Sequence, residues 1–338
     1  MADGRIVCFG ELLLRLTAPG HEVLLQTPRL DVHVGGAEAN VAVSLARLGR
    51  PAAMVSVIPD TALGYAARDE LRRHGVDTAG VRTGSGRMGL YFLSAGAVTR
   101  PSDVLYDRAD SAFALAAPDL VDWEAALVGA SWLHLSGVTP AIGRRAADAA
   151  LRAAGEALRL GIPVSFDGNY RAKLWAAWDG DGPVIVRRLM ESADLAFADD
   201  RDIALVLGER FDDPDPATRL RNAAAAAFDA FPNLKRIACT TRRQHAVGHH
   251  ELAAVLLMRE RDCTTDAVAL SGIVDRIGGG DAFAAGLLFG LTGGLDDQAS
   301  LDIALAAAAL KHSIPGDFNL ATEADIRAAL QGGFDVRR

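Results

Sequence analysis

Cysteine is scarce in this 338-residue sequence, which contains only three: Cys8, Cys239 and Cys263. They lie far apart, and no two of them form a Cys-X-X-Cys pair. The spacing therefore predicts neither a zinc site nor a disulfide framework. Cys8 and Cys239 stand in apolar runs and are expected to be small core residues, and reduced thiols fit a protein of the cytoplasm.

A basic excess and a long apolar run are also missing. The formal net charge is -8, which argues against broad electrostatic binding to nucleic acid or anionic lipid. The first residues carry no basic stretch followed by an apolar one, and the apolar run at residues 282–291 is short and contains Gly286 and Gly290. We therefore expect a cytoplasmic location and neither nucleic acid nor a membrane as a partner.

Apolar residues make up half of the sequence, enough for a large core. Strand patterns alternate with helix patterns, which favours an α/β fold with a parallel sheet covered by helices on both faces. No linker is apparent, so residues 1–338 are expected to form one domain. Segments at about 12–34 and 87–112 break the alternation and are predicted to form a small separate sheet, such as a lid, with residues 23–34 as an exposed strand pair. The main strands are predicted at residues 5–10, 53–58, 132–136, 163–167, 195–198 and 236–240, and the clearest helices at 37–48, 65–74 and 143–160.

Three consecutive glycines, Gly278, Gly279 and Gly280, precede Asp281 and an almost wholly apolar helix pattern. Glycines let a backbone approach a ligand closely, and a helix start presents unpaired N–H groups with partial positive charge. Together they suit a phosphoryl group in transfer, and the carboxylate of Asp281 could accept the proton of an attacking hydroxyl. A simple turn with Asp281 as a helix cap explains the same residues equally well. The phosphate-loop pattern GxxxxGK[ST] is absent, as is a GxGxxG after the first strand.

This segment resembles the C-terminal signature of the PfkB, or ribokinase-like, carbohydrate kinases, commonly written DTxGAGD. Arg276 replaces the usual threonine and Gly279 the usual alanine. The resemblance extends over nearly the whole chain. It implies a ribokinase-like three-layer α/β/α fold with a small β-sheet lid, ATP and Mg²⁺ as cofactors, and catalytic roles for Asp281 and the three glycines before it. The matching residues are Asp275, Gly278, Gly280 and Asp281.

A second segment resembles the N-terminal signature of the same family. Gly35 and Gly36 open a helix pattern that contains Asn40, and the resemblance implies that these residues contact the sugar. The physical interpretation agrees, because the amide of Asn40 can both donate and accept hydrogen bonds. Without the resemblance, an ordinary helix start would be the better explanation.

Further segments resemble the 2-keto-3-deoxygluconate kinases of that family, for example residues 9–16 and 166–175. Arginine suits a sugar acid because its planar guanidinium pairs with a carboxylate, and tyrosine offers a hydroxyl and a flat surface. Surface ion pairs are the alternative for either arginine alone, and a structural turn is the alternative for Asn169, which follows a predicted strand end. The implied substrate-binding residues, besides Gly35, Gly36, Asn40 and Asp281, are Tyr91, Tyr106, Arg108, Asn169 and Arg171.

The residues expected to bind the nucleotide differ from the family pattern more than those expected to bind the sugar. Arg242 stands where small residues are usual, and His312 is expected to serve packing more than catalysis. Asp199 and Asp202 take the place of the family's NxxE and are the candidate Mg²⁺ ligands, with a solvated helix start as the alternative. Some relatives bind a monovalent cation, and that point is left open here. The resemblance implies nucleotide contacts for Thr240, Arg242, Gly248, Gly278, Gly280, His312 and Gly316.

The resemblance implies an ATP-dependent carbohydrate kinase, and the arginines that match the subgroup favour a sugar acid as its acceptor. The resemblance implies 2-keto-3-deoxygluconate as the substrate and its 6-phosphate as the product. Kinases for fructose, ribose or 2-keto-3-deoxygalactonate are alternatives, and the last differs from the gluconate kinase by the configuration of one substrate hydroxyl. A weakly catalytic sugar-binding regulator is an alternative of another class, supported by the altered nucleotide residues. A homodimer formed through the lid is implied by the resemblance alone.

Overall fold

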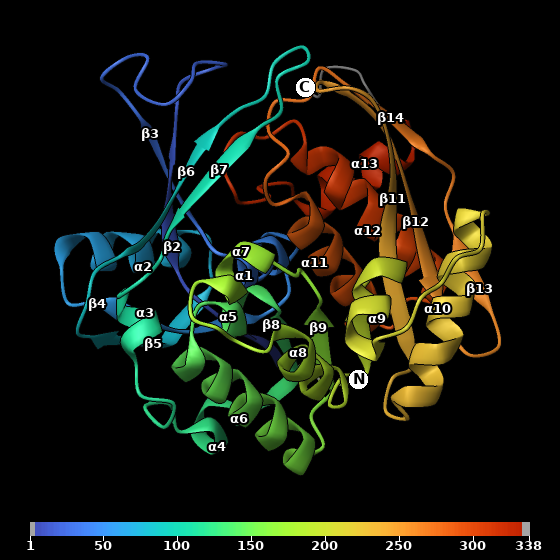
Figure 1. Ribbon diagram of the computed structural model, residues 1–338, viewed down its shortest axis with the longest axis horizontal. Helices are drawn as coiled ribbons and strands as arrows, with labels where there is room; N and C mark the ends of the chain where they lie inside the picture. Colours follow the sequence, from blue (N-terminus) through green and yellow to red (C-terminus); the bar gives the residue numbers. More distant parts are fainter. Residues whose placement is uncertain (1–3, 333–338) are drawn as a thin grey trace.

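A ten-stranded sheet forms the centre of the computed structural model, which describes residues 4–332 (Figure 1). Neighbouring strands run parallel in the order β11 (Arg236–Ala246), β10 (Leu195–Phe197), β9 (Val164–Asp167), β8 (Ala130–Ser136), β1 (Arg5–Phe9), β4 (Ala52–Pro59) and β5 (Asp77–Gly84). Beyond β11 the sheet continues antiparallel through β12 (His249–Leu257), β13 (Asp262–Thr264) and β14 (Val268–Ser271). The predicted, mostly parallel central sheet is therefore confirmed.

Both faces of this sheet are buried, and β1 shows how the sequence achieves it. Ile6 and Cys8 belong to one apolar cluster, whereas Val7 and Phe9 belong to another on the opposite face. Side chains alternate along a strand, so one continuous apolar run fills both sides of the sheet. This is why short runs without polar alternation were recognisable as central strands.

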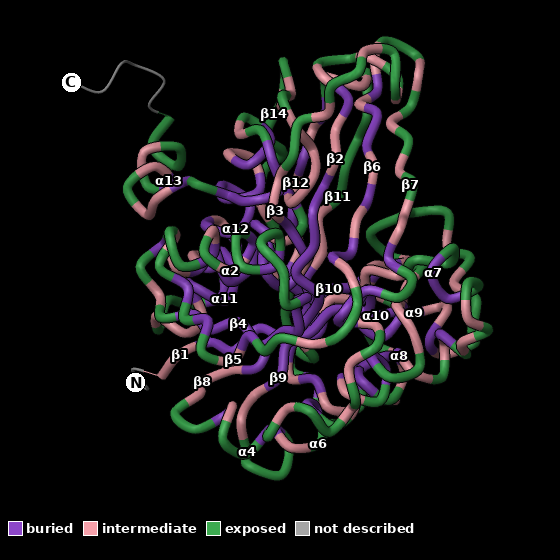
Figure 2. Tube along the Cα trace, turned by 90° about the vertical axis from the view of Figure 1, so that its left-hand side faces the viewer, coloured by how far each residue is buried: buried purple, intermediate pink, exposed green. Residues whose placement is uncertain are grey.

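Helices cover both of these faces. The Ile6 face packs against α1 (Ala37–Arg47), α2 (Ala62–Arg73), α11 (Gly279–Thr292), α12 (Asp297–Lys311) and α13 (Glu323–Leu330). The Val7 face packs against α3 (Ala112–Leu115), α4 (Trp123–Ala126), α5 (Val138–Ala141), α6 (Arg144–Leu160), α7 (Ala172–Ala176), α8 (Gly182–Met190), α9 (Asp200–Leu207) and α10 (Pro216–Ala230). Buried segments gather in the sheet and in α11, while the outer helices are exposed on one side (Figure 2). The predicted three-layer architecture is confirmed.

A separate four-stranded sheet projects from the main body (Figure 1). Its order is β3 (Asp31–Gly35), β2 (Leu13–Thr17), β6 (Gly89–Ser94) and β7 (Asp103–Asp107), with β2 and β6 parallel and the outer pairs antiparallel. Leu13, Tyr91 and Leu93 pack together with Ile277, which precedes α11. The predicted small sheet is confirmed, whereas the organisation of the whole chain as one domain stays a prediction.

Two details differ from the sequence-based expectation. Residues 23–34 do not form an exposed strand pair, because only β3 at their end is a strand and the preceding residues are mostly turns. Pro28 lacks an N–H donor, which disfavours a continuous strand ladder there. The antiparallel strands beyond β11 are absent from the predicted main strands, because their half-exposed faces weaken the apolar pattern.

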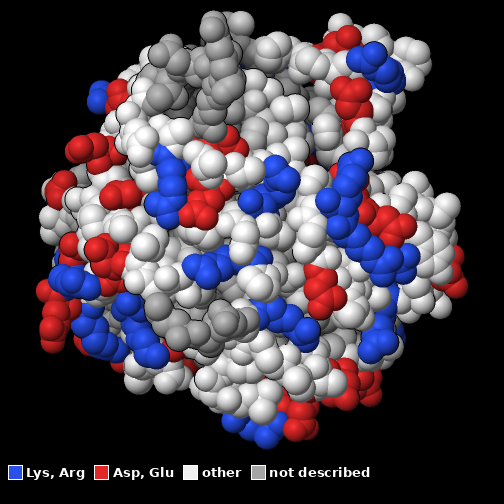
Figure 3. Space-filling view, turned by 180° about the vertical axis from the view of Figure 1, so that it is seen from behind, with Lys and Arg blue, Asp and Glu red and all other residues white. Residues whose placement is uncertain are grey.

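Within residues 4–332, no helix has both the length and the apolar character needed to cross a bilayer. On the face shown in Figure 3, acidic and basic side chains are interspersed, so neither sign of charge dominates that face.

Candidate active site

A cavity of about 970 Å³ lies where the parallel strands β9 and β10 end. Its lining comes from the small sheet, the start of α1, the loops after β9 and β10, the strand β11 and the loop before α11. In open parallel sheets, ligands bind at this carboxyl edge because loops diverge there and leave a crevice. The small sheet closes one side of the cavity through residues of β2, β6 and β7.

The loop before α11 is shaped by Gly278. Its φ is 81°, in the left-handed region that favours glycine. A Cβ at this position would lie 2.0 Å from the carbonyl oxygen of Asp317, so only glycine allows the two segments to approach this closely. The next three residues form the first turn of α11, where N–H groups have no carbonyl four residues earlier in the helix. These amides and the helix dipole suit an anion.

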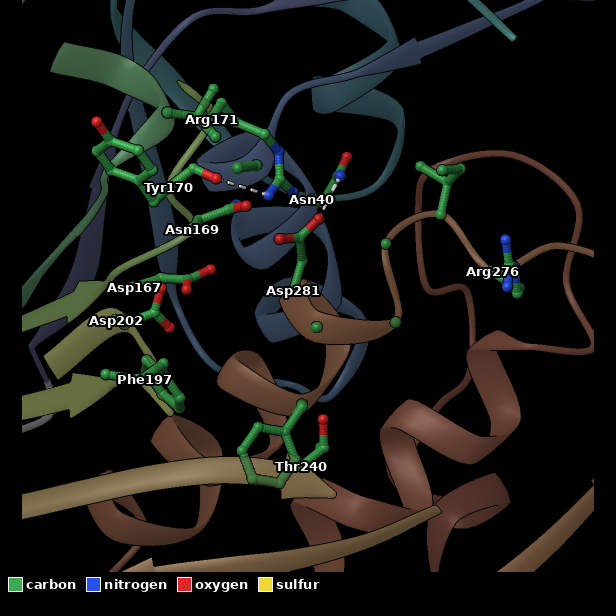
Figure 4. Close-up of a pocket in the computed structure, with 18 of the residues that line it drawn as sticks. Asn40, Asp167, Asn169, Tyr170, Arg171, Phe197, Asp202, Thr240, Arg276 and Asp281 are labelled. Carbon is green, nitrogen blue, oxygen red and sulfur yellow. Dashed lines mark hydrogen bonds between the residues drawn. The ribbon is translucent and has the colours of Figure 1, made fainter. Parts of the chain in front are cut away.

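Asp281 lies in this first turn and faces Asn40 of α1 (Figure 4). The Asn40 side chain donates a hydrogen bond from Nδ2 to Asp281 Oδ2 over 2.6 Å. Burial raises the pKa of Asp281 to about 7, against the lowering effect of the Asn40 hydrogen bond. A carboxyl group with such a pKa can take up and release a proton near neutral pH.

Two further carboxylates line the cavity near Asp281: Asp167 at the end of β9 and Asp202 in α9 (Figure 4). Burial raises the pKa of Asp202 to about 6, and burial together with the negative charges of Asp281 and Asp202 raises that of Asp167 well above its usual value. Asp199 instead caps α9, where Oδ1 accepts the N–H groups of Arg201 and Asp202 and Oδ2 accepts from the Arg201 side chain. Asp199 thus serves the helix start.

The arginines expected to bind a sugar acid have different surroundings. Arg108 is buried, and its Nε donates to Glu11 Oε2 over 2.5 Å, so the protein itself compensates its charge. Arg171 is exposed in the cavity and forms no ion pair with any side chain of residues 4–332. Its Nη1 donates to the carbonyl oxygen of Tyr170 over 3.3 Å (Figure 4). Arg171 therefore remains available to an anionic ligand.

Arg15 ties the small sheet to the loops around α11. This β2 side chain is 1% exposed. Its Nη2 lies 2.6 Å from Asp275 Oδ2, and its Nε lies 3.1 Å from Asp317 Oδ1. Tyr91 of β6 donates its hydroxyl to Asp317 Oδ2 over 2.6 Å, and Asp275 Oδ1 accepts the N–H of Ile277 over 3.0 Å. The network holds the start of the glycine loop against the small sheet.

Comparison with known proteins shows which protein family has this site. Residues 3–322 match the model of the pfkB family of carbohydrate kinases. The chain belongs to the PfkB family of carbohydrate kinases. This PfkB kinase is 33% identical to a 2-dehydro-3-deoxygalactonokinase of Haloferax volcanii over 328 residues, which cover 97% of each chain.

Solved structures agree with this assignment. The crystal structure of a 2-dehydro-3-deoxygluconokinase from Thermotoga maritima matches the PfkB kinase with a TM-score of 0.91 and 37% identity, covering 97% of this chain and 100% of that one. A putative ribokinase II from E. coli, solved with ATP and Mg²⁺, matches with a TM-score of 0.81 over 98% of this chain and 100% of that one. At 19% identity, that second likeness shows the shared fold alone.

Most residues singled out from the sequence lie together on this cavity. Asn169 has a φ of 35°, so it turns the chain as well as lining the cavity. Tyr91 donates its hydroxyl proton to Asp317, and the residue also lines the cavity. The lining includes Gly36, Asn40, Tyr91, Tyr106, Arg108, Asn169, Arg171, Asp199, Asp202, Thr240, Arg242, Gly278, Gly279, Gly280 and Asp281.

Two predicted glycines lie behind the lining of the PfkB site. A Cβ at Gly35 would lie 2.3 Å from Asp317 Oδ2, so this glycine allows the end of β3 to pack on that carboxylate. Gly316 donates its N–H to Asp275 Oδ2 over 3.0 Å. Both glycines therefore act on the position of the loop before α11, through the carboxylates that Arg15 also binds.

His312 and Gly248 also lie outside the lining. The Nδ1–H of His312 donates to the carbonyl oxygen of Ala308 over 2.7 Å, and a Cβ at Gly279 would lie 3.0 Å from the His312 ring. The ring therefore packs behind the glycine loop. Gly248 lies in the turn between β11 and β12, beyond the β11 residues that line the cavity.

Asp167, Arg276 and Asp317 line the cavity although none of them is among the site residues predicted from the sequence. Asp167 is the last residue of a predicted strand, and this place at the carboxyl end of a strand is the signal available for it. Asp317 offers no comparable signal. Its importance comes from contact with Gly278 and Arg15, which are remote from it in the sequence.

Proposed function

We propose that this PfkB kinase transfers the γ-phosphoryl group of ATP to the primary hydroxyl of 2-keto-3-deoxygluconate, forming the 6-phosphate. The hydrogen-bonded pair of Asn40 and Asp281, at the glycine-opened start of α11 inside the cavity, carries the proposal. Relatives at 33% and 37% identity are named kinases of 2-dehydro-3-deoxy sugar acids, the same compounds as the 2-keto-3-deoxy acids, which supports the choice of acceptor.

In the proposed reaction, Asp281 accepts the proton of the acceptor hydroxyl while Asn40 orients its carboxylate. The Oδ1 of Asn40 is buried and has no hydrogen-bond partner within residues 4–332, so it can accept from a sugar hydroxyl. The N–H groups of the first turn of α11 stabilise negative charge on the phosphoryl group. Phosphoryl transfer has a loose transition state, so positioning and charge stabilisation supply most of the catalysis.

The carboxylates on the cavity suit a cation that arrives with the nucleotide. Within residues 4–332, no group of three or more His, Cys, Asp or Glu side chains is placed to hold a metal ion by itself. Mg²⁺ commonly keeps several waters and takes one or two carboxylates besides phosphate oxygens, where it neutralises their charge. Asp202 and Asp167 fit this role better than Asp199, because both oxygens of Asp199 are engaged at the start of α9, whereas Asp202 uses only Oδ2 there.

The rate is expected to depend on pH through Asp281. Burial raises its pKa to about 7. A general base acts when unprotonated, so kcat/KM should fall about tenfold per pH unit below that value and level off above it. A pH–rate profile of the wild type and Asp281→Asn tests this, because the variant should lack the acidic limb. A wild-type rate that stays constant well below neutral pH would contradict the assignment.

Arg171 is expected to select for the sugar acid. Replacing it with Met removes the unpaired guanidinium, and loss of a charge-assisted hydrogen bond should lower kcat/KM for 2-keto-3-deoxygluconate by roughly 10- to 100-fold. Fructose or ribose, which carry no carboxylate, should be affected much less. The ratio of kcat/KM for acid and neutral acceptors, measured in both proteins, isolates this effect from any general loss of catalysis.

Arg108→Met provides the contrast. Its partner Glu11 would remain buried without a compensating charge, so the free energy of unfolding should fall by about 3–5 kcal/mol. Denaturant unfolding of both arginine variants measures the difference, since exposed Arg171 should contribute little to stability. If Arg108→Met is stable and loses activity only toward the sugar acid, Arg108 and not Arg171 selects the acceptor.

A second candidate acceptor is 2-keto-3-deoxygalactonate, favoured by the Haloferax volcanii relative. A coupled assay of ATP turnover with both acids, fructose and ribose tests the proposal. The highest kcat/KM is expected with 2-keto-3-deoxygluconate. A clear preference for 2-keto-3-deoxygalactonate would make that acid the proposed substrate instead. Sugar binding without turnover of any acceptor would instead favour a sugar-binding regulator.

A further inference from the structure

Arg242 and Arg276 form a cationic pair on the cavity wall. Arg242 lies on β11 and Arg276 lies just before the glycine loop, and both line the cavity. Burial is the main cause that lowers the pKa of Arg242, and the positive charge of Arg276 lowers it further. Neither forms an ion pair with an Asp or Glu among residues 4–332.

The neighbours of the pair do not neutralise it. Arg276 donates from Nη2 to Ser102 Oγ over 3.2 Å, a neutral partner in the hairpin between β6 and β7 of the small sheet. Burial and the two arginines lower the pKa values of His250 and His312, and an imidazole in either protonation state cannot compensate the positive charge of a guanidinium. The pair therefore presents uncompensated positive charge to the cavity.

The rest of the cavity restricts what the pair can bind. In Figure 4, Arg171 and Arg276 lie on opposite sides of Asp281, so Arg276 is separate from the arginine assigned to the acceptor. Asp167 and Asp202 line the β9–α9 side and repel an anion unless a cation accompanies it. An elongated polyanion is thus drawn toward the glycine loop and the two arginines.

We propose that Arg242 and Arg276 bind the polyphosphate of the nucleoside triphosphate. This inference rests on the proposed function and adds to it the residues that hold the donor. Planar guanidinium groups match phosphate oxygens with paired N–H donors. The arginines thus assist the α11 amides at the positions where the family commonly has small or hydroxyl residues, and Ser102 aims Arg276 from the small sheet.

Calorimetric titration of the full-length protein with adenosine, AMP, ADP and ATP tests the pair, with Mg²⁺ present throughout. Arg242→Met and Arg276→Met should each weaken ATP binding by roughly 10- to 100-fold, while adenosine affinity changes by less than about threefold. The loss should grow from AMP to ATP, and Arg276→Lys should recover part of it. Arg243→Met makes the same charge change on β11 outside the cavity lining and should bind ATP like the wild type.

Wild-type affinity for ATP in both Met variants would overturn the inference and leave the proposed function intact. An equal loss for adenosine and ATP would also overturn it, because it would show a general disturbance of the nucleotide site. Weakened binding of 2-keto-3-deoxygluconate with unchanged ATP binding would assign the pair to the acceptor instead. If the wild type binds no ATP, the proposed function fails together with the inference.

Discussion

Replacing Asp281 with Asn is expected to lower kcat by roughly 100- to 10,000-fold, the range for a positioned acid–base group. The amide keeps the shape of the carboxylate and an oxygen for Asn40, but it cannot take the proton of the acceptor hydroxyl. The variant should keep its fold, because the amide fills the same space at the start of α11. A large loss of turnover without a loss of structure is therefore the expected result.

The stability of Asp281→Asn follows from linkage. Burial raises the pKa of Asp281 to about 7, so the folded protein binds this proton more tightly than the unfolded chain does. The stability that the protonated carboxyl contributes is fully present below the unfolded pKa and is lost as the pH rises through about 7. Asn does not titrate. Near pH 8, the free energy of unfolding of the variant should therefore equal or exceed that of the wild type.

Steady-state kcat at saturating ATP and sugar acid, with denaturant unfolding near pH 8, measures both quantities. Asp302→Asn is a matched control, since it makes the same change on α12 outside the cavity lining and should keep wild-type turnover. Full turnover by Asp281→Asn would falsify the assigned base. A marked fall in its unfolding free energy would instead indicate that the carboxylate holds the helix start together.

Gly278→Ala is expected to damage stability and activity together. An added Cβ would lie 2.0 Å from the Asp317 carbonyl oxygen, and the φ of 81° is strained for alanine. Strain and overpacking should lower the free energy of unfolding by about 2–5 kcal/mol. Because the loop must shift away from residue 317, the first amides of α11 lose their alignment. Loss of such oxyanion-type donors should lower kcat by roughly 100-fold or more.

Gly280→Ala separates the two effects. Position 280 lies in the first turn of α11, and a Cβ there meets no atom within 4 Å. Alanine favours a helix over glycine by up to about 1 kcal/mol, so this variant should be at least as stable as the wild type. Thermal or denaturant unfolding of both variants provides the comparison. Equal losses of stability would contradict the role of the Gly278–Asp317 approach.

Local patterns were sufficient for much of the architecture. Continuous apolar runs identified the strands of the parallel sheet, since a strand buried on both faces needs apolar side chains in both directions. The prediction for residues 23–34 is wrong because apolar residues there are exposed, as with Leu25, and residues 23–30 form no strand that could pair with β3. The strands beyond β11 are absent from the predicted main strands because each has a partly polar, partly exposed pattern.

The glycine loop was recognisable because its function depends on neighbours in sequence. The roles of the arginines were not, although all are the same residue type. Arg108 is neutralised by Glu11, Arg15 by Asp275 and Asp317, whereas Arg171 has no ion-pair partner among residues 4–332. No spacing in the chain distinguishes these cases, because each partner comes from a different element.

By itself the sequence determined the α/β alternation, the family signatures and the placement of Asp281 after three glycines at a helix start. These features are encoded within a few turns or strands of the chain. The tertiary structure alone decided which charges are compensated and which face the cavity, and hence the pKa of Asp281 and the pairing of Arg242 with Arg276. Such properties depend on distances between residues remote in sequence, and only packing of the completed fold sets those distances.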